Sequence, residues 1–225
     1  MNWSQKTRSG FEVLRARTLG SRIPLAVRIQ LLNRCSNRCV YCNLYNDRKT
    51  ALDAEWVKKL LRQMKRAGTT VVSFSGGEPT MYDRICELVE VCGALGMAPE
   101  INTNGFRIPE MISGLRGLNL LKISVDGPEE IHDRQAGRKG SFEKAVAALD
   151  AAAANGIRTT IATVLTGINI RHTEEILEIA GHYNVTAMFL TLKTIYRGVE
   201  DVSGIAPSGD DYSAAVESLI EKKKK

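Results

Sequence analysis

The sequence has few aromatic residues and no long hydrophobic run. Aromatic residues make up 6% of its 225 residues, hydrophobic residues 44% and charged residues 25%. No stretch of 18 apolar residues is present, so the sequence predicts no membrane-spanning helix. Charged residues interrupt positions 1–20, where a secretory signal would need an apolar stretch. We therefore expect a cytoplasmic globular protein with one large domain and no membrane partner.

An excess of acidic residues is also missing. The chain has 31 Lys and Arg against 25 Asp and Glu, a formal net charge of +6. The surplus lies at the two ends, because residues 1–28 hold six basic residues against one acidic residue and residues 222–225 are four lysines. Residues 29–221 have a net charge of −3. A nucleic-acid-binding face needs its positive charge within the folded body, so we expect no nucleic-acid partner.

Cysteines are few, and three of the five lie within eight residues. Cys35, Cys39 and Cys42 form a C-x3-C-x2-C motif, whereas Cys86 and Cys92 stand apart and no cysteine follows them. An odd, clustered set is not typical of a disulfide framework. Soft thiolates suit an iron-sulfur cluster or zinc, and three ligands without an evident fourth leave one coordination position open. A zinc site and plain buried cysteines remain the alternatives.

Short apolar, often β-branched runs alternate with segments of helical period, which predicts an α/β fold with a parallel sheet. Six such units are too few for an eight-unit barrel, so a partial (β/α)6 barrel or a doubly wound sheet is expected. We expect a basic N-terminal extension at 1–25, a core domain at 26–200 and a C-terminal helical segment at 201–225 that begins a further region. The predicted strands are 26–32, 70–75, 99–103, 120–125, 157–165 and 185–192, and the predicted helices are 53–67, 83–96, a short one after 109, 141–156, one after 173 and one after 211.

Two helix boundaries have sequence signals. In the helix at 53–67 one apolar face is predicted, and Gly68 is placed to end the helix. Asp83 is predicted to cap the next helix. The residues predicted to share the apolar face are Trp56, Leu60, Leu61 and Met64.

Ligands of parallel α/β folds meet the loops that leave the carboxyl ends of the strands. After the second predicted strand, residues 75–79 read Ser-Gly-Gly-Glu-Pro. Gly76 and Gly77 permit close backbone approach, Pro79 fixes the exit of the chain, and Glu78 offers a carboxylate to a cationic amino group. Taken alone, the segment is also typical of an ordinary turn.

Later strands end in polar residues of the same kind. Asn104 and Gly105 form a turn signal after the third strand. Ser124 and Asp126 lie two residues apart at the end of the fourth, where both side chains can bond a polar ligand, or where Asp126 can form an Asx turn. Four further polar residues occupy later loops without a spacing that assigns them a role: Thr166, Asn169, Lys193 and Arg197.

The cysteine motif, with Tyr41 before its last cysteine, and the following Gly-Gly-Glu-Pro segment resemble those of the radical S-adenosylmethionine (SAM) enzymes. The resemblance covers residues 27–192. It implies that three cysteines hold three irons of a 4Fe-4S cluster and that the methionine part of SAM chelates the fourth iron. It also implies SAM-binding roles for Tyr41, for residues 76–79, for Asn104, and for Ser124 and Asp126.

One departure from the family pattern concerns the SAM carboxylate. Many relatives carry an arginine after the motif that contains Ser124, and an alignment without gaps places Ala136 there. Arg134 and Arg138 flank that position, and either can supply the guanidinium fork. Arg138 is the candidate site residue, and the alternative is that both arginines are solvated.

The resemblance implies an enzyme that reductively cleaves SAM to a 5′-deoxyadenosyl radical, which abstracts hydrogen from a substrate. Peptide modification and cofactor or natural-product biosynthesis are both open, and no residue is assigned a catalytic role of its own. A flavodoxin-type or ferredoxin-type electron donor is the expected partner. The alternative is a cluster-binding or zinc-binding scaffold or regulator without turnover.

Overall fold

A computed structural model describes residues 10, 11, 14, 18, 22–46, 50–192 and 202–223. Six parallel strands form one sheet in the order β1-β2-β3-β4-β5-β6. A doubly wound sheet reverses its strand order, whereas here each strand pairs with its successor in the sequence. The partial (β/α)6 barrel is therefore confirmed. The strands are β1 (Ala26–Gln30), β2 (Val71–Ser75), β3 (Ala98–Thr103), β4 (Leu120–Ser124), β5 (Thr159–Leu165) and β6 (Thr186–Thr191).

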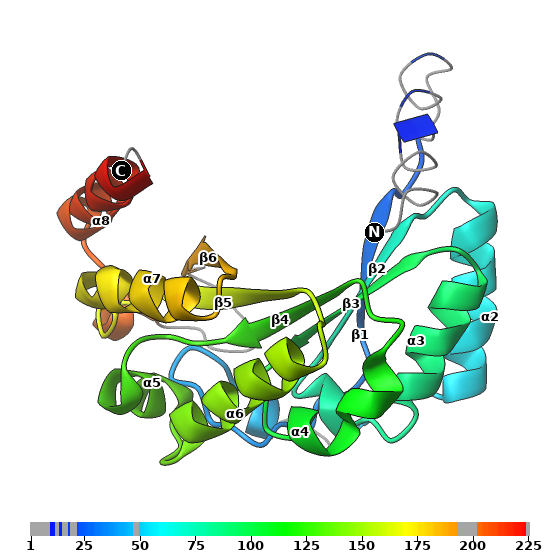
Figure 1. Cartoon of the computed structure of the whole chain (residues 1–225), viewed down its shortest axis with the longest axis horizontal. Coiled ribbons are helices and arrows are strands. Elements are labelled where there is room, and N and C mark those ends of the chain that lie inside the picture. Colours follow the sequence, from blue (N-terminus) through cyan, green and yellow to red (C-terminus); the bar gives the residue numbers. More distant parts are fainter. Residues whose placement is uncertain are drawn as a thin grey trace.

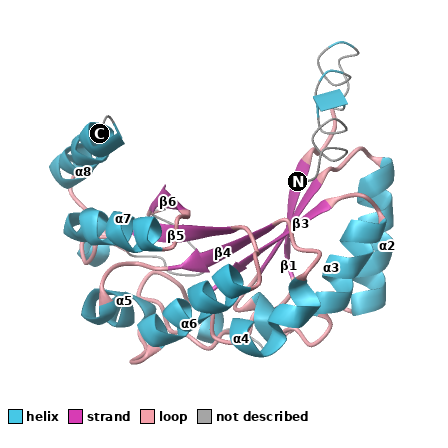
Figure 2. Ribbon diagram, viewed as in Figure 1, coloured by secondary structure: helices cyan, strands magenta, loops and turns pink. Residues whose placement is uncertain are grey.

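Helices follow the outer side of the curved sheet and leave its inner side open, as Figures 1 and 2 show. None of the helices that the structure describes is long and apolar enough to cross a membrane. The α-helices are α2 (Ala54–Arg66), α3 (Ile85–Ala94), α4 (Ile108–Met111), α5 (Glu129–Ala136), α6 (Ser141–Ala154), α7 (Thr173–His182) and α8 (Gly209–Lys223). The 3-10 turns are η1 (Leu44–Asn46), η2 (Pro79–Met81), η3 (Ile112–Leu115), η4 (Ile170–His172) and η5 (Ser203–Ile205).

Helix α2 begins and ends at the predicted signals. The side chain of Asp53 accepts a hydrogen bond of 2.8 Å from the backbone N–H of Trp56, and Gly68 follows the helix with a φ of 94°. The predicted buried face is partly wrong, because Trp56 is 51% exposed. The other three residues are confirmed, because Leu61 is fully buried and Leu60 and Met64 pack against the core. Val57, which is also fully buried, takes the place of Trp56 on this face.

Two other expectations about helices need correction. Helix α3 has Arg84 at its N-cap position without a side-chain hydrogen bond, so Asp83 does not cap it. Helix α5 was not predicted, because its sequence EEIHDRQA lacks an apolar period. Its buried side chains are mostly polar and include His132 and Gln135.

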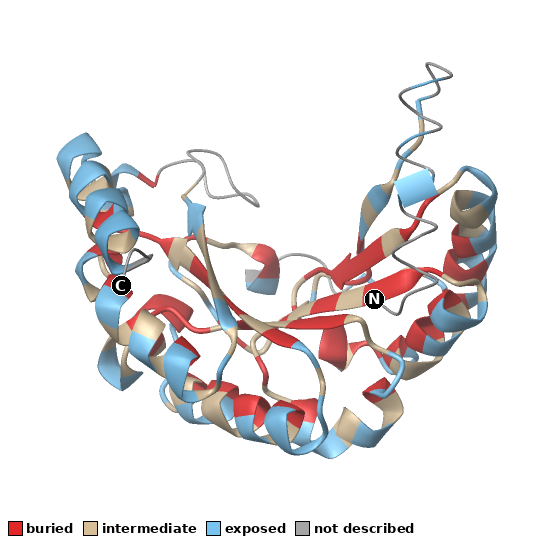
Figure 3. Ribbon diagram, turned by 45° about the horizontal axis from the view of Figure 1, so that its top comes forward, coloured by how far each residue is buried: buried red, intermediate tan, exposed pale blue. Residues whose placement is uncertain are grey.

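The two faces of the sheet differ in chemistry. On β4, Leu121 and Ile123 are fully buried in the hydrophobic core that the sheet forms with the outer helices. Lys122 and Ser124 alternate with them and line the hollow inner side. Figure 3 shows buried residues along the strands and the helix faces turned toward them. The inner face is therefore free to hold polar ligands.

Candidate cofactor site

A pocket of about 240 Å³ opens on the inner side of the sheet. We call it the thiol pocket, because all three cysteines of the C-x3-C-x2-C motif line it. Its walls come from the loop after β1 and from strands β1 to β6 and the segments that follow them. The predicted site residues that line it are Cys35, Cys39, Tyr41, Cys42, Gly76, Gly77, Glu78, Asn104 and Ser124.

The start of the cysteine loop rests on the Gly-Gly-Glu segment. The N–H of Gly77 donates to the carbonyl of Leu32 at 2.8 Å, and the N–H of Glu78 donates to the carbonyl of Arg34 at 2.8 Å. A Cβ on Gly76 would lie 2.4 Å from the Leu32 oxygen, and one on Gly77 would lie 2.2 Å from the Arg34 oxygen. The close approach predicted for these glycines is therefore made to the cysteine loop itself.

Helix α5 and the residue that ends it hold the middle of the same loop. The N–H of Arg38 donates to the carbonyl of Ala136 at 2.9 Å, and the N–H of Val40 donates to the carbonyl of Gln135 at 3.0 Å. Gly137 has a φ of 60°, and a Cβ there would lie 2.2 Å from the Arg38 oxygen. The unpredicted helix therefore contributes directly to the position of the thiols.

The thiols are partly buried and free. Burial raises the pKa of Cys35 to about 11, with a further contribution from the Glu78 carboxylate. Burial also raises the pKa of Cys39, with help from the Asp126 carboxylate. These two thiols are therefore protonated at neutral pH in the metal-free protein. Metal binding requires the thiolate, so loading the site releases protons.

The donor set of the thiol pocket distinguishes between a single metal ion and a cluster. In the described part of the chain, no three His, Cys, Asp or Glu side chains lie close enough together to hold a single metal ion. Three soft thiols around one pocket suit an iron-sulfur cluster, in which each thiolate binds its own iron. Two N–H groups already point at one of these sulfurs: the backbone N–H of Asn37 lies 3.4 Å from Cys35 Sγ, and Asn104 Nδ2 lies 3.9 Å from it. The residues present fit a cluster.

Glu78 is buried, with 1% of its surface exposed. Its Oε1 accepts hydrogen bonds from the N–H of Thr80 at 3.0 Å, from the Thr80 hydroxyl at 2.6 Å and from the Thr103 hydroxyl at 2.6 Å. Its Oε2 accepts one from the N–H of Asn104 at 2.8 Å. Burial raises the pKa of this carboxyl group despite these bonds. The carboxylate thus joins the ends of β2 and β3 as well as lining the pocket.

Asn104 also has a structural role. Its Nδ2 donates to Ser36 Oγ at 2.9 Å, and its Oδ1 accepts from the N–H of Phe106 at 3.1 Å. Gly105 has a φ of 86°, so the predicted turn is present. Asn104 therefore links the end of β3 to the cysteine loop.

Asp126 does not share the pocket with Ser124. It lies beyond the end of β4, where Gly127 has a φ of 151° and redirects the chain. Its carboxylate is 2% exposed and accepts from the N–H of Val164 at 3.1 Å. Burial raises its pKa to about 7. Asn169 Nδ2 donates to the Asp126 carbonyl at 2.9 Å, so this predicted loop residue also braces the strand ends.

Two more predicted residues lie outside the thiol pocket. Pro79 is buried at the start of η2. Arg138 lies on the outer side of the cysteine loop, where its Nη1 donates to the Ser36 carbonyl at 2.7 Å and its guanidinium stacks 4.4 Å from the centre of the Phe106 ring. Arg134 does not line the pocket either. Lys193 and Arg197 lie outside the described residues.

Several residues that line the pocket were not predicted. Arg28 and Lys122 point to it from the inner faces of β1 and β4, and their alternation with buried neighbours was the available signal. Asn37 had no signal in its spacing. It is 3% exposed, and its Nδ2 donates to Ser141 Oγ at 2.9 Å. Its Oδ1 is a buried acceptor without a hydrogen-bond partner among the described residues, which suits a ligand that donates a hydrogen bond.

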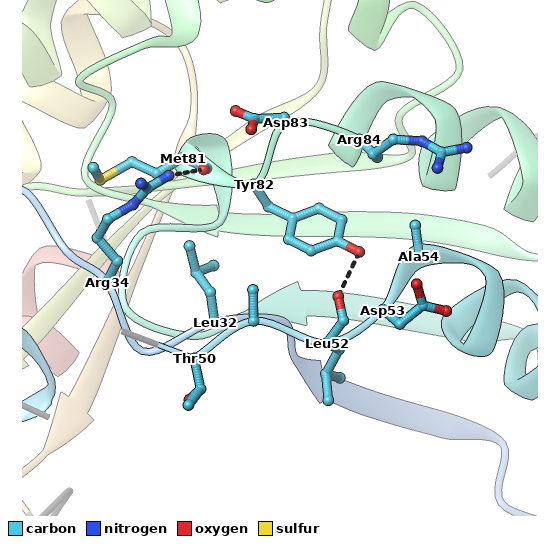
Figure 4. Close-up of a pocket in the computed structure, with 11 residues that line it drawn as sticks. Leu32, Arg34, Thr50, Leu52, Asp53, Ala54, Met81, Tyr82, Asp83 and Arg84 are labelled. Atoms are coloured by element: carbon cyan, nitrogen blue, oxygen red, sulfur yellow. Dashed lines mark hydrogen bonds between the residues drawn. The ribbon is translucent and has the colours of Figure 1, made fainter. Parts of the chain in front are cut away.

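Figure 4 shows another pocket, of about 380 Å³, beside the start of α2. Arg34 Nη2 donates there to the Met81 carbonyl at 2.7 Å, and the Tyr82 hydroxyl donates to the Leu52 carbonyl at 2.9 Å. None of the predicted site residues lines this pocket. The predicted chemistry therefore gathers at the thiol pocket.

Comparisons with known proteins agree with this arrangement. Mycofactocin maturase MftC of Mycobacterium tuberculosis is 29% identical over 206 residues, which cover 88% of this chain and 52% of that protein. GTP 3′,8-cyclase of Marinobacter nauticus is 32% identical over 173 residues, which cover 73% of this chain and 52% of that protein. The chain thus spans about half the length of these curated relatives.

The solved structure of Streptococcus suis SuiB bound to S-adenosylmethionine matches with a TM-score of 0.79 at 20% identity, covering 95% of this chain and 51% of SuiB. At this identity the match shows a shared fold. The family model for the radical SAM superfamily matches residues 29–180. A 4Fe-4S cluster and SAM are the cofactors of that family. The chain belongs to the radical SAM superfamily.

Proposed function

We propose that this chain binds a 4Fe-4S cluster through Cys35, Cys39 and Cys42 and acts as a radical SAM enzyme. The observation that carries the proposal is that all three thiols line one pocket together with the Gly-Gly-Glu segment and Ser124. When bound, the cofactors supply reductive cleavage of the SAM sulfonium to methionine and a 5′-deoxyadenosyl radical, which takes hydrogen from the substrate. The protein binds, orients and shields these groups.

Different residues of the pocket position the thiols and bind SAM. Gly76 and Gly77 let the cysteine loop sit close to the end of β2, which places the thiols. Ser124, from β4, offers a hydroxyl to polar groups of SAM. Glu78 Oε2 has the capacity to accept a bond from the methionine ammonium beside the one it takes from Asn104.

Other residues support the pocket without contacting the ligand, or line it as a wall. Asp126 and Pro79 hold the ends of their strands, and we assign them to positioning. Arg138 is directed to the Ser36 carbonyl, so its placement does not support a contact with the SAM carboxylate. Tyr41 lines the pocket and is 8% exposed, which suits a wall against the bound ligand.

Space for a substrate lies deeper on the inner face. The same pocket is also lined by Ala162 and Val164 of β5 and Met188 of β6, beside the charged Arg28 and Lys122. Similar proteins include the PqqA peptide cyclase of Bradyrhizobium diazoefficiens and SuiB, which has been solved bound to its precursor peptide SuiA. We propose a peptide or a small cofactor precursor as substrate. Since the chain spans about half the length of such relatives, residues beyond this core would contribute to the choice of substrate.

For partners and location, we propose a cytoplasmic protein reduced by a flavodoxin-type or ferredoxin-type donor, without a nucleic-acid or membrane partner. All five cysteines are free, which suits a reducing compartment. We also propose the division into an extension at 1–25, a core at 26–200 and a further region starting at 201–225. In support, β1 starts at Ala26, and α8 leaves Val216 and Ile220 half exposed.

Anaerobic SAM cleavage tests the function. The iron-reconstituted protein with dithionite and SAM should yield 5′-deoxyadenosine, Cys39→Ala should abolish the product, and Cys86→Ala should retain it because Cys86 lies on α3 away from the pocket. A stable cluster absorbance without SAM cleavage would favour the scaffold or regulator. A colourless protein with stoichiometric zinc would favour the zinc site.

A further inference from the structure

A second hollow, of about 440 Å³, lies against the cysteine loop. We call it the cationic hollow. Cys35 lines both this hollow and the thiol pocket, so the loop that carries the first thiol is the wall between them. The other residues of the hollow that matter here are Ser36, Arg38, Phe106, Arg107 and Arg138.

Among the described residues, carboxylates neutralise little of the positive charge of the hollow. Three arginines and no acidic residue are among the described residues that line it. Arg138 Nη1 donates to the Ser36 carbonyl at 2.7 Å, and Arg107 Nη1 donates to the Thr80 carbonyl at 3.1 Å. These acceptors are neutral. The nearest acidic partner is Glu110, which lies 3.5 Å from Arg107 and is 69% exposed, so it screens little.

Aromatic rings contact two of these arginines and one further cation, Lys144. Phe106 has the Arg138 guanidinium 4.4 Å and the Lys144 ammonium 5.6 Å from its ring centre. The Arg38 guanidinium lies 5.9 Å from the ring centre of Tyr45. Such contacts orient a cation without neutralising it. The hollow therefore presents a fixed positive surface.

Two cations outside the hollow show the contrasting case, in which carboxylates neutralise the charge. Lys58 and Arg84 both contact the carboxylates of Glu55 and Glu87. Residues 29–221 as a whole have a net charge of −3. The three arginines beside Cys35 thus form a group of positive charges in a body of net negative charge, which predicts attraction of a partner with an acidic surface.

The position of the hollow indicates what that partner does. Ser36 separates its arginines from Cys35, and Asn104 Nδ2 bonds Ser36 Oγ at 2.9 Å while facing Cys35 Sγ at 3.9 Å. Under the proposed function, on which this step rests, Cys35 is a ligand of the cluster. The hollow is then where the surface comes within one residue of the metal. Because electron transfer slows steeply with distance, this is a favourable place for an electron to enter.

We infer that the cationic hollow is the docking surface for the electron donor, an acidic, low-potential flavoprotein of the flavodoxin type. In the step that it serves, the reduced flavin is oxidised by one electron and that electron reduces the cluster by one. No bond forms or breaks, and no proton is transferred. RNA is also anionic, but a track for a phosphate backbone needs charge spread over a longer surface than this hollow.

Charge reversal tests the inference. Arg38→Glu with Lys144→Glu removes two cations whose side chains contact aromatic rings in the described part of the chain. Stopped-flow absorbance would follow reduction of the reconstituted cluster by a reduced acidic flavodoxin, and calorimetry would follow binding of the oxidised flavodoxin. We expect both rate and affinity to fall about ten-fold, and the difference to shrink at high salt. Lys59→Glu with Arg62→Glu, two exposed changes on α2 with the same total change of charge, should leave both unchanged.

Dithionite separates the two proposals. If dithionite fails to reduce a cluster in the unmodified protein, the proposed function fails. If dithionite reduces both proteins and flavodoxin reduces the double variant as fast as the unmodified protein, the docking inference is overturned. Tight binding of a transfer RNA mixture that the double variant abolishes, with flavodoxin unaffected, would overturn it in favour of RNA. Should the double variant not hold a cluster, Lys144→Glu alone repeats the test, since Lys144 lies on α6 outside the cysteine loop.

Discussion

The Oε2 atom of Glu78 accepts a 2.8 Å hydrogen bond from the backbone N–H of Asn104. This bond joins two segments that the sequence presents as separate motifs, one after β2 and one after β3. Asn104 in turn donates to Ser36 in the cysteine loop at 2.9 Å. A buried carboxylate thus connects the ends of two strands, and through Asn104 it reaches the loop that carries the thiols.

Glu78→Gln should weaken the fold and the pocket together. A carboxylate accepts at both oxygens, whereas an amide presents an NH2 group to one set of the donors from Thr80, Thr103 and Asn104. We expect a loss of about 1–3 kcal/mol in the free energy of unfolding, measured with urea. Glu110→Gln is the matched control, because Glu110 is largely exposed. Equal stability of the two variants would contradict the role given to Glu78.

Gly77→Ala should impair cluster loading. The added Cβ would lie 2.2 Å from the Arg34 oxygen, so the cysteine loop must move away from β2. Iron content after reconstitution should fall well below that of the unmodified protein. Gly93→Ala in α3 is the control, since its Cβ would meet nothing within 4 Å, and it should keep full iron content. Full loading of Gly77→Ala would show that the close approach is dispensable.

Asp126→Asn should steepen the pH dependence of stability in the metal-free protein. Burial raises the pKa of Asp126 from 3.8 to about 7, so this group makes the fold less stable as pH rises through that interval, by about 4 kcal/mol in all. Burial lowers the pKa of His132 from 6.5 to about 4, so His132 makes the fold more stable as pH rises from 4 to 6.5. The two effects oppose each other.

Removal of Asp126 takes away the effect that opposes that of His132 in this pair. Urea unfolding between pH 4.5 and pH 7.5 should therefore show a larger gain of stability with pH in Asp126→Asn than in the unmodified protein. His132→Gln should show the reverse slope. Parallel profiles for all three proteins would contradict the burial of these two groups.

Metal loading should depend steeply on pH. The pKa of Cys35 is raised to about 11 and that of Cys39 is raised as well, so each thiol gives up a proton when it binds metal. Metal affinity should rise about ten-fold per pH unit for each such thiol, or about a hundred-fold for the pair. Cadmium binding to the metal-free protein at pH 6.5 and pH 7.5, followed by thiolate absorbance, measures this. A pH-independent affinity would show that these thiols are already ionised.

The order of the strands and most helices followed from the sequence, because β-branched runs and helical periods are local signals. The gathering of the thiols, the Gly-Gly-Glu segment and Ser124 in one pocket also followed, because parallel strands bring their carboxyl ends to one edge. The features that the sequence did not predict depend on contacts between segments that are far apart in the chain. Helix α5 is held by polar bonds, and its main contribution, a pair of carbonyls offered to the cysteine loop, has no pattern in the sequence.

The direction of long side chains was the other feature that the sequence did not predict. Arg138 is close in sequence to the expected position of a SAM-binding arginine, yet it turns to the Ser36 carbonyl and the Phe106 ring on the outer side. Spacing along the chain does not determine which side of a loop a long side chain takes. Arg28, by contrast, could have been predicted, because alternate residues of a strand point to the inner face of the sheet and line the pocket.

Electron paramagnetic resonance of the reconstituted, dithionite-reduced protein, recorded without and with SAM, tests the central claim most directly. That claim is that Cys35, Cys39 and Cys42 leave one iron of the cluster open to SAM. We predict the signal of a reduced 4Fe-4S cluster that changes when SAM is added and that is lost in Cys39→Ala. A cluster signal that SAM leaves unchanged, or a protein that holds zinc and gives no signal, would contradict the account.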